Sequence, residues 1–128
     1  MPITAEMEET ISYLSGKDDY ALFAEFAAYL HTGVEPSPDI DICFSSPARN
    51  VFFPERATIY YRGTPLLVIT QEALLLTKMN QLTSPQRTDA KTTRDRQVIQ
   101  ILRKKIDISK LRELVNNLED SFWTQGWY

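Results

Sequence analysis

The segment that decides the fold is Pro38-Asp39-Ile40-Asp41-Ile42-Cys43-Phe44, in which two carboxylates stand one residue apart inside an apolar run. Successive side chains of a β-strand point to opposite faces, so Asp39 and Asp41 share one face while the two isoleucines share the other. Two like charges side by side oppose folding unless a cation joins them. The pattern therefore predicts a strand over 39–44 with two carboxylates on one face that call for a cation beside them.

The spacing of the paired aspartates allows two interpretations. Carboxylates a few ångströms apart are hard oxygen ligands, the type that holds Mg²⁺ between a protein and nucleotide phosphates. Alternatively, Asp39 and Asp41 form a solvent-exposed pair at a strand end, and each makes local turn hydrogen bonds. The neighbouring Cys43 is expected to be a small buried hydrophobic residue. The flanking sequence has to decide between a metal site and an exposed pair.

Length and composition indicate a single domain over 1–128. The only cysteine excludes an internal disulfide and fits a reducing compartment. No apolar stretch approaches the ~20 residues that span a bilayer. The opening segment, MPITAEMEET, is acidic and unlike a signal peptide. We therefore expect a soluble cytoplasmic protein with no membrane partner.

Charge is distributed unevenly along the chain. Residues 1–42 contain nine acids against Lys17 alone, whereas 87–112 contains nine cations against three acids. This asymmetry indicates mutual docking, a cleft with walls of opposite charge, or simply solvated faces. The basic helix expected over 91–105 also raises nucleic-acid binding as an alternative function. The helix dipole, which favours cations near a helix C-terminus, explains part of the same charge without any ligand.

Apolar periodicity and capping residues predict short strands followed by helices. Gly16 and Gly33 are natural helix terminators, and the prolines of 34–38 exclude a helix there. A turn is expected over 62–65. Strands are expected over 20–23, 39–44, 57–61 and 66–69, and helices from Thr4 to Gly16, over 25–31, after Thr70, over about 90–105 and after Asp107 or Ser109. The order indicates an α+β fold whose C-terminal part, about 70–120, is helical.

Two residue groups near element ends carry further predictions. His31, the only histidine, ends the helix over 25–31, a place that favours a hydrogen-bonding role over a ligand role. The tail SFWTQGWY (121–128) holds both tryptophans. We expect these to pack on the body of the protein or on a partner, including a second copy of the chain.

Three segments carry a resemblance to a known family. YALFAEFAAYLHTGVEPSPDIDICF (20–44) resembles the opening signature of the nucleotidyltransferase superfamily, in its minimal and abortive-infection toxin-like branches. In those branches a strand runs into Gly-Gly or Gly-Ser, then a short helix, a His-Gly-like turn and Asp-hydrophobic-Asp on the next strand. TPLLVITQEALLLTKMNQL (64–82) is similar to the family's strand, capped helix and lysine, and RTDAKTTRDRQVIQILRK (87–104) to the helix that follows. The resemblance runs in the family's order from Tyr20 to Leu102.

This resemblance implies a fold, a set of site residues and a reaction. The fold would be a nucleotidyltransferase-like small mixed β-sheet with flanking helices. Asp39 and Asp41 match the metal-binding carboxylates, Lys78 the lysine on the helix after the last strand, and Asp95 the acid after a basic residue on the next helix. The implied reaction is Mg²⁺-dependent transfer of a nucleoside monophosphate from NTP to a protein or RNA acceptor. The alternative places Lys78 at the surface and pairs Asp95 with Lys91, one helical turn earlier.

The chain departs from the family pattern at the phosphate-binding motif. Where the family has its glycine pair, whose bare backbone lets phosphates approach helix N–H groups, this sequence has Ala24-Glu25. Glu35 stands where relatives often have a cation. The strand over 57–61 offers no third carboxylate, although Glu55 precedes it. The first alternative function is therefore a catalytically inactive binding module of this fold, such as a toxin–antitoxin or complex subunit.

Overall fold

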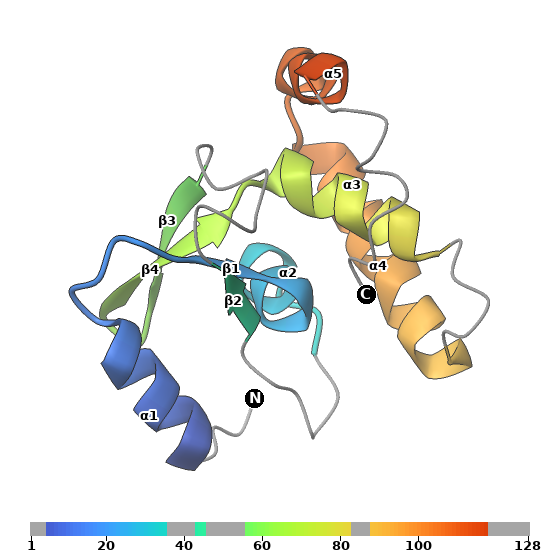
Figure 1. The fold of residues 1–128 in the computed structure, drawn as a ribbon. Helices are drawn as coiled ribbons and strands as arrows, with labels where there is room; N and C mark the ends of the chain where they lie inside the picture. Colours follow the sequence, from blue (N-terminus) through green and yellow to red (C-terminus); the bar gives the residue numbers. More distant parts are fainter. Residues whose placement is uncertain (1–4, 36–42, 46–55, 83–87, 118–128) are drawn as a thin grey trace. The chain divides into compact units, whose positions relative to one another are not determined.

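The computed structural model describes residues 5–35, 43–45, 56–82 and 88–117 (Figure 1). The chain divides into two compact units, Met1–Thr70 and Gln71–Tyr128. The first unit contains α1 (Ala5–Leu14), β1 (Ala21–Phe23), α2 (Ala24–Thr32), β2 (Cys43–Ser45), β3 (Arg56–Tyr61) and β4 (Thr64–Ile69), and the second contains α3 (Gln71–Gln81), α4 (Asp89–Lys105) and α5 (Ile108–Asn117). A single domain over 1–128 stays a prediction.

The strands of the first unit form one four-stranded sheet in the order β2-β1-β4-β3. The central pair, β1 and β4, is parallel with Leu22 opposite Val68, and both outer pairs are antiparallel. Phe23, the last residue of β1, lies opposite Cys43, the first residue of β2. The small mixed sheet, the flanking helices and the helical C-terminal part confirm the predicted α+β class.

The hairpin between β3 and β4 turns over two residues. Tyr61 pairs with Thr64, and Arg62 and Gly63 have φ values of 49° and 81°. Two successive positive φ angles are typical of a type I′ turn, whose twist matches the flanking strands. The expected turn over 62–65 is therefore wrong in its second half, because Thr64 and Pro65 belong to β4. Tyr61 and Thr64 form the hydrogen-bonded pair that closes the hairpin, so the next pair, Tyr60 and Pro65, is one that exchanges no hydrogen bonds. Pro65 therefore fits in β4 although it has no N–H to donate.

Apolar residues at helical spacing build the first unit around its sheet. Met7, Ile11 and Leu14 of α1 are buried, as their spacing predicts. α2 contributes Phe26, which is fully buried. Gly33 ends α2 in the left-handed conformation (φ 76°) and donates its N–H to the Tyr29 carbonyl over 2.8 Å, so the predicted terminator is confirmed.

The second unit consists of the three C-terminal helices; the cap of α4 was not predicted, whereas Asp107 was one of the two residues expected to open α5. The Thr88 hydroxyl accepts a hydrogen bond from the Lys91 N–H over 3.3 Å at the start of α4. Asp107 Oδ1 accepts from the N–H groups of Ser109 and Lys110 over 2.9 and 3.3 Å at the start of α5. Val98 and Leu102 of α4 and Leu114 of α5 are buried.

Candidate functional site

The junction between β1 and α2 is the first of two places where the structure holds predicted site residues. Phe23 is the N-cap of α2 with extended backbone, and its side chain makes no capping hydrogen bond. Ala24, the first residue of α2, has φ 65°. This is the left-handed region, which costs a residue with a Cβ about 1–2 kcal/mol and which glycine adopts freely. The chain therefore makes a turn suited to glycine at the position where the resemblance implies one.

Glu25 follows in the first turn of α2. Its side chain is half-buried. The first N–H groups of a helix point away from it and carry partial positive charge, so they attract anions. Glu25 thus places a carboxylate at the helix end that would otherwise attract an external phosphate. The junction therefore combines a backbone turn suited to glycine with an acidic residue in the first turn of the helix.

The predicted metal ligands precede β2 in the sequence. Asp39 and Asp41 lie outside the described residues, as does Glu55. Cys43, two residues after Asp41 in the chain, lies opposite Phe23 at the end of β1. Two carboxylates are a donor set that suits Mg²⁺. Within the residues that the structure describes, no cluster of three or more His, Cys, Asp and Glu side chains could hold a metal ion.

The second place is a buried ion pair between α3 and α4. Lys78 Nζ donates to Asp95 Oδ1 over 3.0 Å. The two side chains are only 2% and 3% exposed. The structure thus brings together two of the predicted site residues, and the alternative of a surface lysine is wrong. Side chains from the two helices meet because Lys78 and Asp95 both lie on buried faces.

Burial makes this pair sensitive to the loss of either partner. Removing water from two charges costs several kcal/mol for each ion, and mutual attraction offsets this cost only while both partners are present. The Lys78 ammonium is therefore a cation that Asp95 already neutralises. In chemical terms the pair can hold α3 and α4 in register, and it can present a cation to a phosphate only if Asp95 gives up part of its contact.

His31 lies in the last turn of α2, where it joins the helix to the sheet. Its Nε2 donates to the carbonyl of Ile69, the last residue of β4, over 2.7 Å. The side chain is 7% exposed. The hydrogen-bonding role expected for this histidine is the one that the structure contains. It ties the end of α2 to the end of β4 within the first unit.

An aromatic cluster with an arginine was not singled out by the sequence. Phe26 and Tyr29 of α2 both contact Tyr61, with ring centroids 5.5 and 6.4 Å apart, and the Arg62 guanidinium lies 5.5 Å from the Tyr61 ring centre. Burial raises the pKa of Tyr61, although the Arg62 charge acts in the opposite direction. The three-residue spacing of the two α2 aromatics is the signal that would have indicated a shared face.

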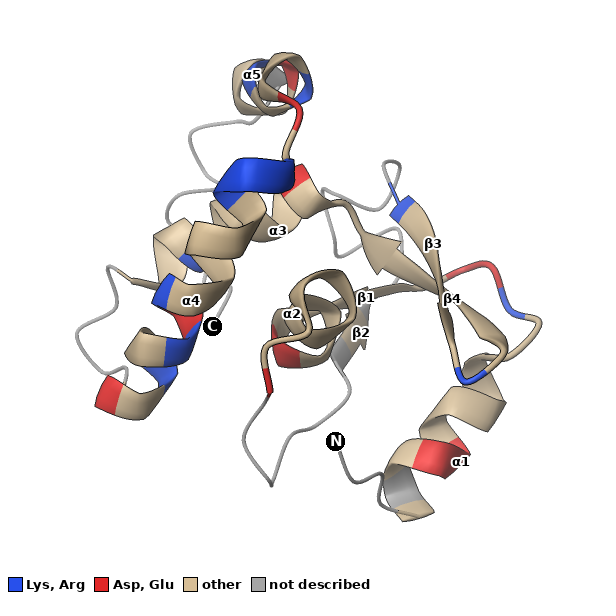
Figure 2. Ribbon diagram, turned by 180° about the vertical axis from the view of Figure 1, so that it is seen from behind, with Lys and Arg blue, Asp and Glu red and all other residues tan. Residues whose placement is uncertain are grey.

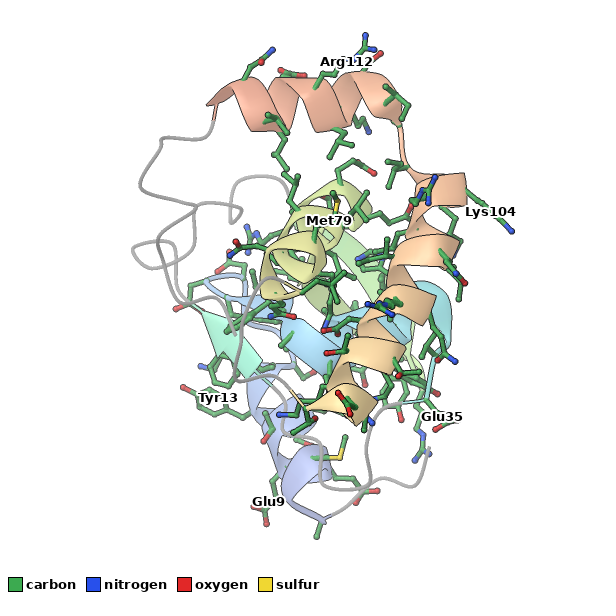
Figure 3. All side chains as sticks on the ribbon, turned by 90° about the vertical axis from the view of Figure 1, so that its right-hand side faces the viewer. Glu9, Tyr13, Glu35, Met79, Lys104 and Arg112 are labelled. Carbon is green, nitrogen blue, oxygen red and sulfur yellow. The ribbon has the colours of Figure 1, made fainter. Side chains whose placement is uncertain are left out.

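No helix in the described ranges is both long and apolar enough to cross a membrane. Most of the described side chains of α1, α4 and α5 are exposed, among them Glu9, Lys104 and Arg112 (Figure 3). Comparisons of the chain with models of protein families, with curated proteins and with solved structures find no match in any of the three.

Proposed function

We propose that this chain is a nucleotidyltransferase-like protein that transfers a nucleoside monophosphate from NTP to a protein or RNA acceptor with the help of Mg²⁺ and releases pyrophosphate. The observation that carries the proposal is the left-handed Ala24 at the junction of β1 and α2, beside the start of β2. A non-glycine residue in this conformation is strained, and such strain concentrates at functional sites. The single thiol of Cys43 suits a reducing, cytoplasmic setting.

The parts of the reaction would be divided among a few residues. Asp39 and Asp41 would hold Mg²⁺, which supplies charge neutralisation for the triphosphate. The N–H groups at the start of α2 would face the phosphates from the strained turn at Ala24. The chain's own contribution is positioning and electrostatics, because phosphoryl-type transfer needs little covalent help from a protein.

Lys78 would act as a positioning residue in this proposal. Its ammonium is fixed by Asp95 over 3.0 Å and is shielded from water. A cation in a fixed, dehydrated position keeps a stronger electrostatic effect than one that moves in water. Replacing Asp95 would leave this ammonium buried without its counter-ion, which disfavours its charged form.

Labelled nucleotide transfer tests the proposed activity. Each NTP, radiolabelled on the α-phosphate, is incubated with the protein, Mg²⁺ or Mn²⁺, total RNA and candidate protein acceptors. Label should enter an acceptor with the unmodified chain and disappear with Asp39→Asn combined with Asp41→Asn. Glu8→Gln combined with Glu9→Gln removes two acids from exposed positions on α1 and is the matched control. Absence of transfer to every acceptor, the protein itself included, would refute the proposal.

A catalytically inactive binding module of the same fold is the second candidate function. Two observations favour it: Glu25 adds negative charge at the start of α2, and Lys78 is already neutralised by Asp95. Such a module would serve as a toxin–antitoxin or complex subunit. Calorimetry separates the two candidates, because the module should not bind Mg²⁺–NTP, whereas Ala24→Gly combined with Glu25→Gly should gain measurable affinity. Tight NTP binding by the unmodified chain contradicts the second candidate.

A further inference from the structure

The end of α4 and the start of α5 form an exposed cationic surface, here called the basic surface. Within residues 103–112 the chain has five cations and one acid, so the rest of the chain has a net charge of −7 against −3 for the whole. All five cationic residues are exposed. Figure 2 shows the last turns of α4 as a band of basic residues that leads to α5. The surface consists of Arg103, Lys104, Lys105, Lys110 and Arg112.

The helix dipole accounts for three of these five cations. Cations in the last turn of α4 are favoured by the negative end of its dipole. Lys110, however, lies in the first turn of α5, where the positive end of the helix dipole repels cations. Arg112 comes two residues later in the same helix. Asp107, the only acid of the segment, is occupied as the cap of α5. Two of the five cations therefore lie where the helix dipole does not favour them.

A hollow that is open to solvent lies beside the basic surface, between two of its cations and Gln100. Gln100, Arg103 and Lys104 line a hollow of about 370 Å³. Small-molecule sites occupy roughly 300–1,000 Å³. Positions 100, 103 and 104 share one face of α4, since residues three and four apart are neighbours on a helix. Figure 3 shows Lys104 extending from α4 away from the other helices.

The chemistry of these side chains suits phosphate diesters. The Arg103 guanidinium offers parallel N–H donors that match two phosphate oxygens, and Lys104 adds a mobile point charge. Gln100 has both a donor and an acceptor, as needed for a sugar hydroxyl or a base edge. A carboxylate side chain of an acidic protein would use the charges but would fill only a small part of the hollow. A chain of nucleotides uses both the hollow and the cations that continue onto α5.

We propose that the basic surface binds the backbone of a single-stranded nucleic acid, with one nucleotide in the hollow. This surface would then select the acceptor, a step that rests on the proposed transfer function, whereas the binding itself needs neither NTP nor Mg²⁺. The net charge of the remaining chain would repel nucleic acid elsewhere, so contact would be confined to the basic surface.

Fluorescence anisotropy with labelled oligonucleotides of about 12 nucleotides, a length comparable to single-strand sites, tests this inference. RNA and DNA of the same sequence are titrated at salt concentrations from about 50 to 200 mM without nucleotide or magnesium. Arg103→Gln combined with Lys104→Gln should weaken binding at least tenfold and reduce the salt slope by about 1.4, or ~0.7 for each lost phosphate contact. Lys91→Gln combined with Arg96→Gln removes the same charge from exposed positions of α4 and should change the affinity far less.

The remaining arms separate other partners and other failures. Equal binding of RNA and DNA indicates backbone contacts alone, and tighter RNA binding indicates contacts to the 2′-hydroxyl. Equal losses in both double variants, or binding only to anionic vesicles or polyglutamate, overturn the inference. Arg103→Lys combined with Lys104→Arg keeps the charge and should keep the slope. Transfer to a protein acceptor without oligonucleotide binding overturns this inference alone, whereas oligonucleotide binding without transfer overturns only the proposed activity.

Discussion

The β1–α2 junction and the Lys78–Asp95 pair show two different ways of keeping an unfavourable feature in a fold. At the junction the backbone of Ala24 is strained, with φ 65°, and Glu25 beside it is half-buried. At the pair the backbone is regular helix, and the cost lies in two dehydrated charges 3.0 Å apart. Strain at the junction belongs to one residue and can be relieved there. The cost of the pair is shared by two residues and cannot be removed from one side.

This difference separates what each region contributes to stability. A substitution that removes strain should stabilise the fold, and strained residues of this kind are concentrated at functional sites. A substitution that removes one charge of a buried pair leaves the other uncompensated and should destabilise strongly. Four substitutions test this contrast.

Loss of one partner of the buried pair should have the largest effect. Lys78→Met keeps the length and apolar stem of the side chain but leaves the Asp95 carboxylate buried and unneutralised. We expect a loss of about 3–5 kcal/mol in the free energy of unfolding, measured by urea denaturation. The double variant Lys78→Met with Asp95→Leu removes both charges and should recover most of the loss. A single variant as stable as the double would show that Asp95 is stabilised by other groups.

Relief of the strained junction should have the opposite sign. Ala24→Gly allows the positive φ without a Cβ clash and should stabilise the protein by about 1 kcal/mol, less the added flexibility of the unfolded chain. Ala27→Gly, in the interior of α2, is the control and should destabilise by a similar amount. Chemical denaturation of both variants measures the difference. If Ala24→Gly destabilises like Ala27→Gly, the junction carries no strain.

The turn between β3 and β4 contains the second non-glycine residue with a positive φ among the described residues, and it tests whether such a residue is strained wherever it occurs. Arg62 has φ 49° in a type I′ turn, a position that asparagine adopts more readily. Arg62→Asn should raise the free energy of unfolding by about 0.5 kcal/mol, because the relief of backbone strain outweighs the loss of the contact between the guanidinium and the Tyr61 ring. Thermal and urea unfolding of this variant and of Arg62→Lys, which keeps a cation but gains no turn preference, measure the two terms separately. If neither Arg62→Lys nor Arg62→Asn changes the free energy of unfolding, the cation–ring contact matters more than the strain at this position.

The sequence predicted regular elements better than it predicted the contacts between them. The spacing of Met7, Ile11 and Leu14 fixes a buried helix face, and Gly33 fixes a helix end, because both depend on neighbours in the chain. The extent of the 62–65 turn depended on pairing with another strand, so it was only half right. Of the proposed site, the resemblance named Lys78 and Asp95, but their mutual contact depends on how α3 packs on α4. Periodicity within one helix contains no information on that packing.

The half-buried Tyr61 gives the smallest and most specific test of the same contrast, because partial burial there favours the neutral form of a titratable group. Burial raises the pKa of Tyr61 above its ordinary value of 10.0. Below about pH 9 both the folded and the unfolded chain keep the proton, so its contribution to stability is complete. As the pH rises, the unfolded chain loses the proton first, and this contribution falls until the pH passes the folded pKa.

Tyr61→Phe removes this titration. The free energy of unfolding of the unmodified protein minus that of Tyr61→Phe should stay constant up to about pH 9 and then decrease, because only the unmodified protein has a hydroxyl that titrates at this position. Urea denaturation at a series of pH values measures it, and Tyr60→Phe, which removes an exposed hydroxyl from the neighbouring position, controls for the loss of a tyrosine. A difference that grows above pH 10 in favour of the unmodified protein would mean that the Arg62 charge outweighs burial. In that case the first unit, like the second, would favour a charged group beside a cation.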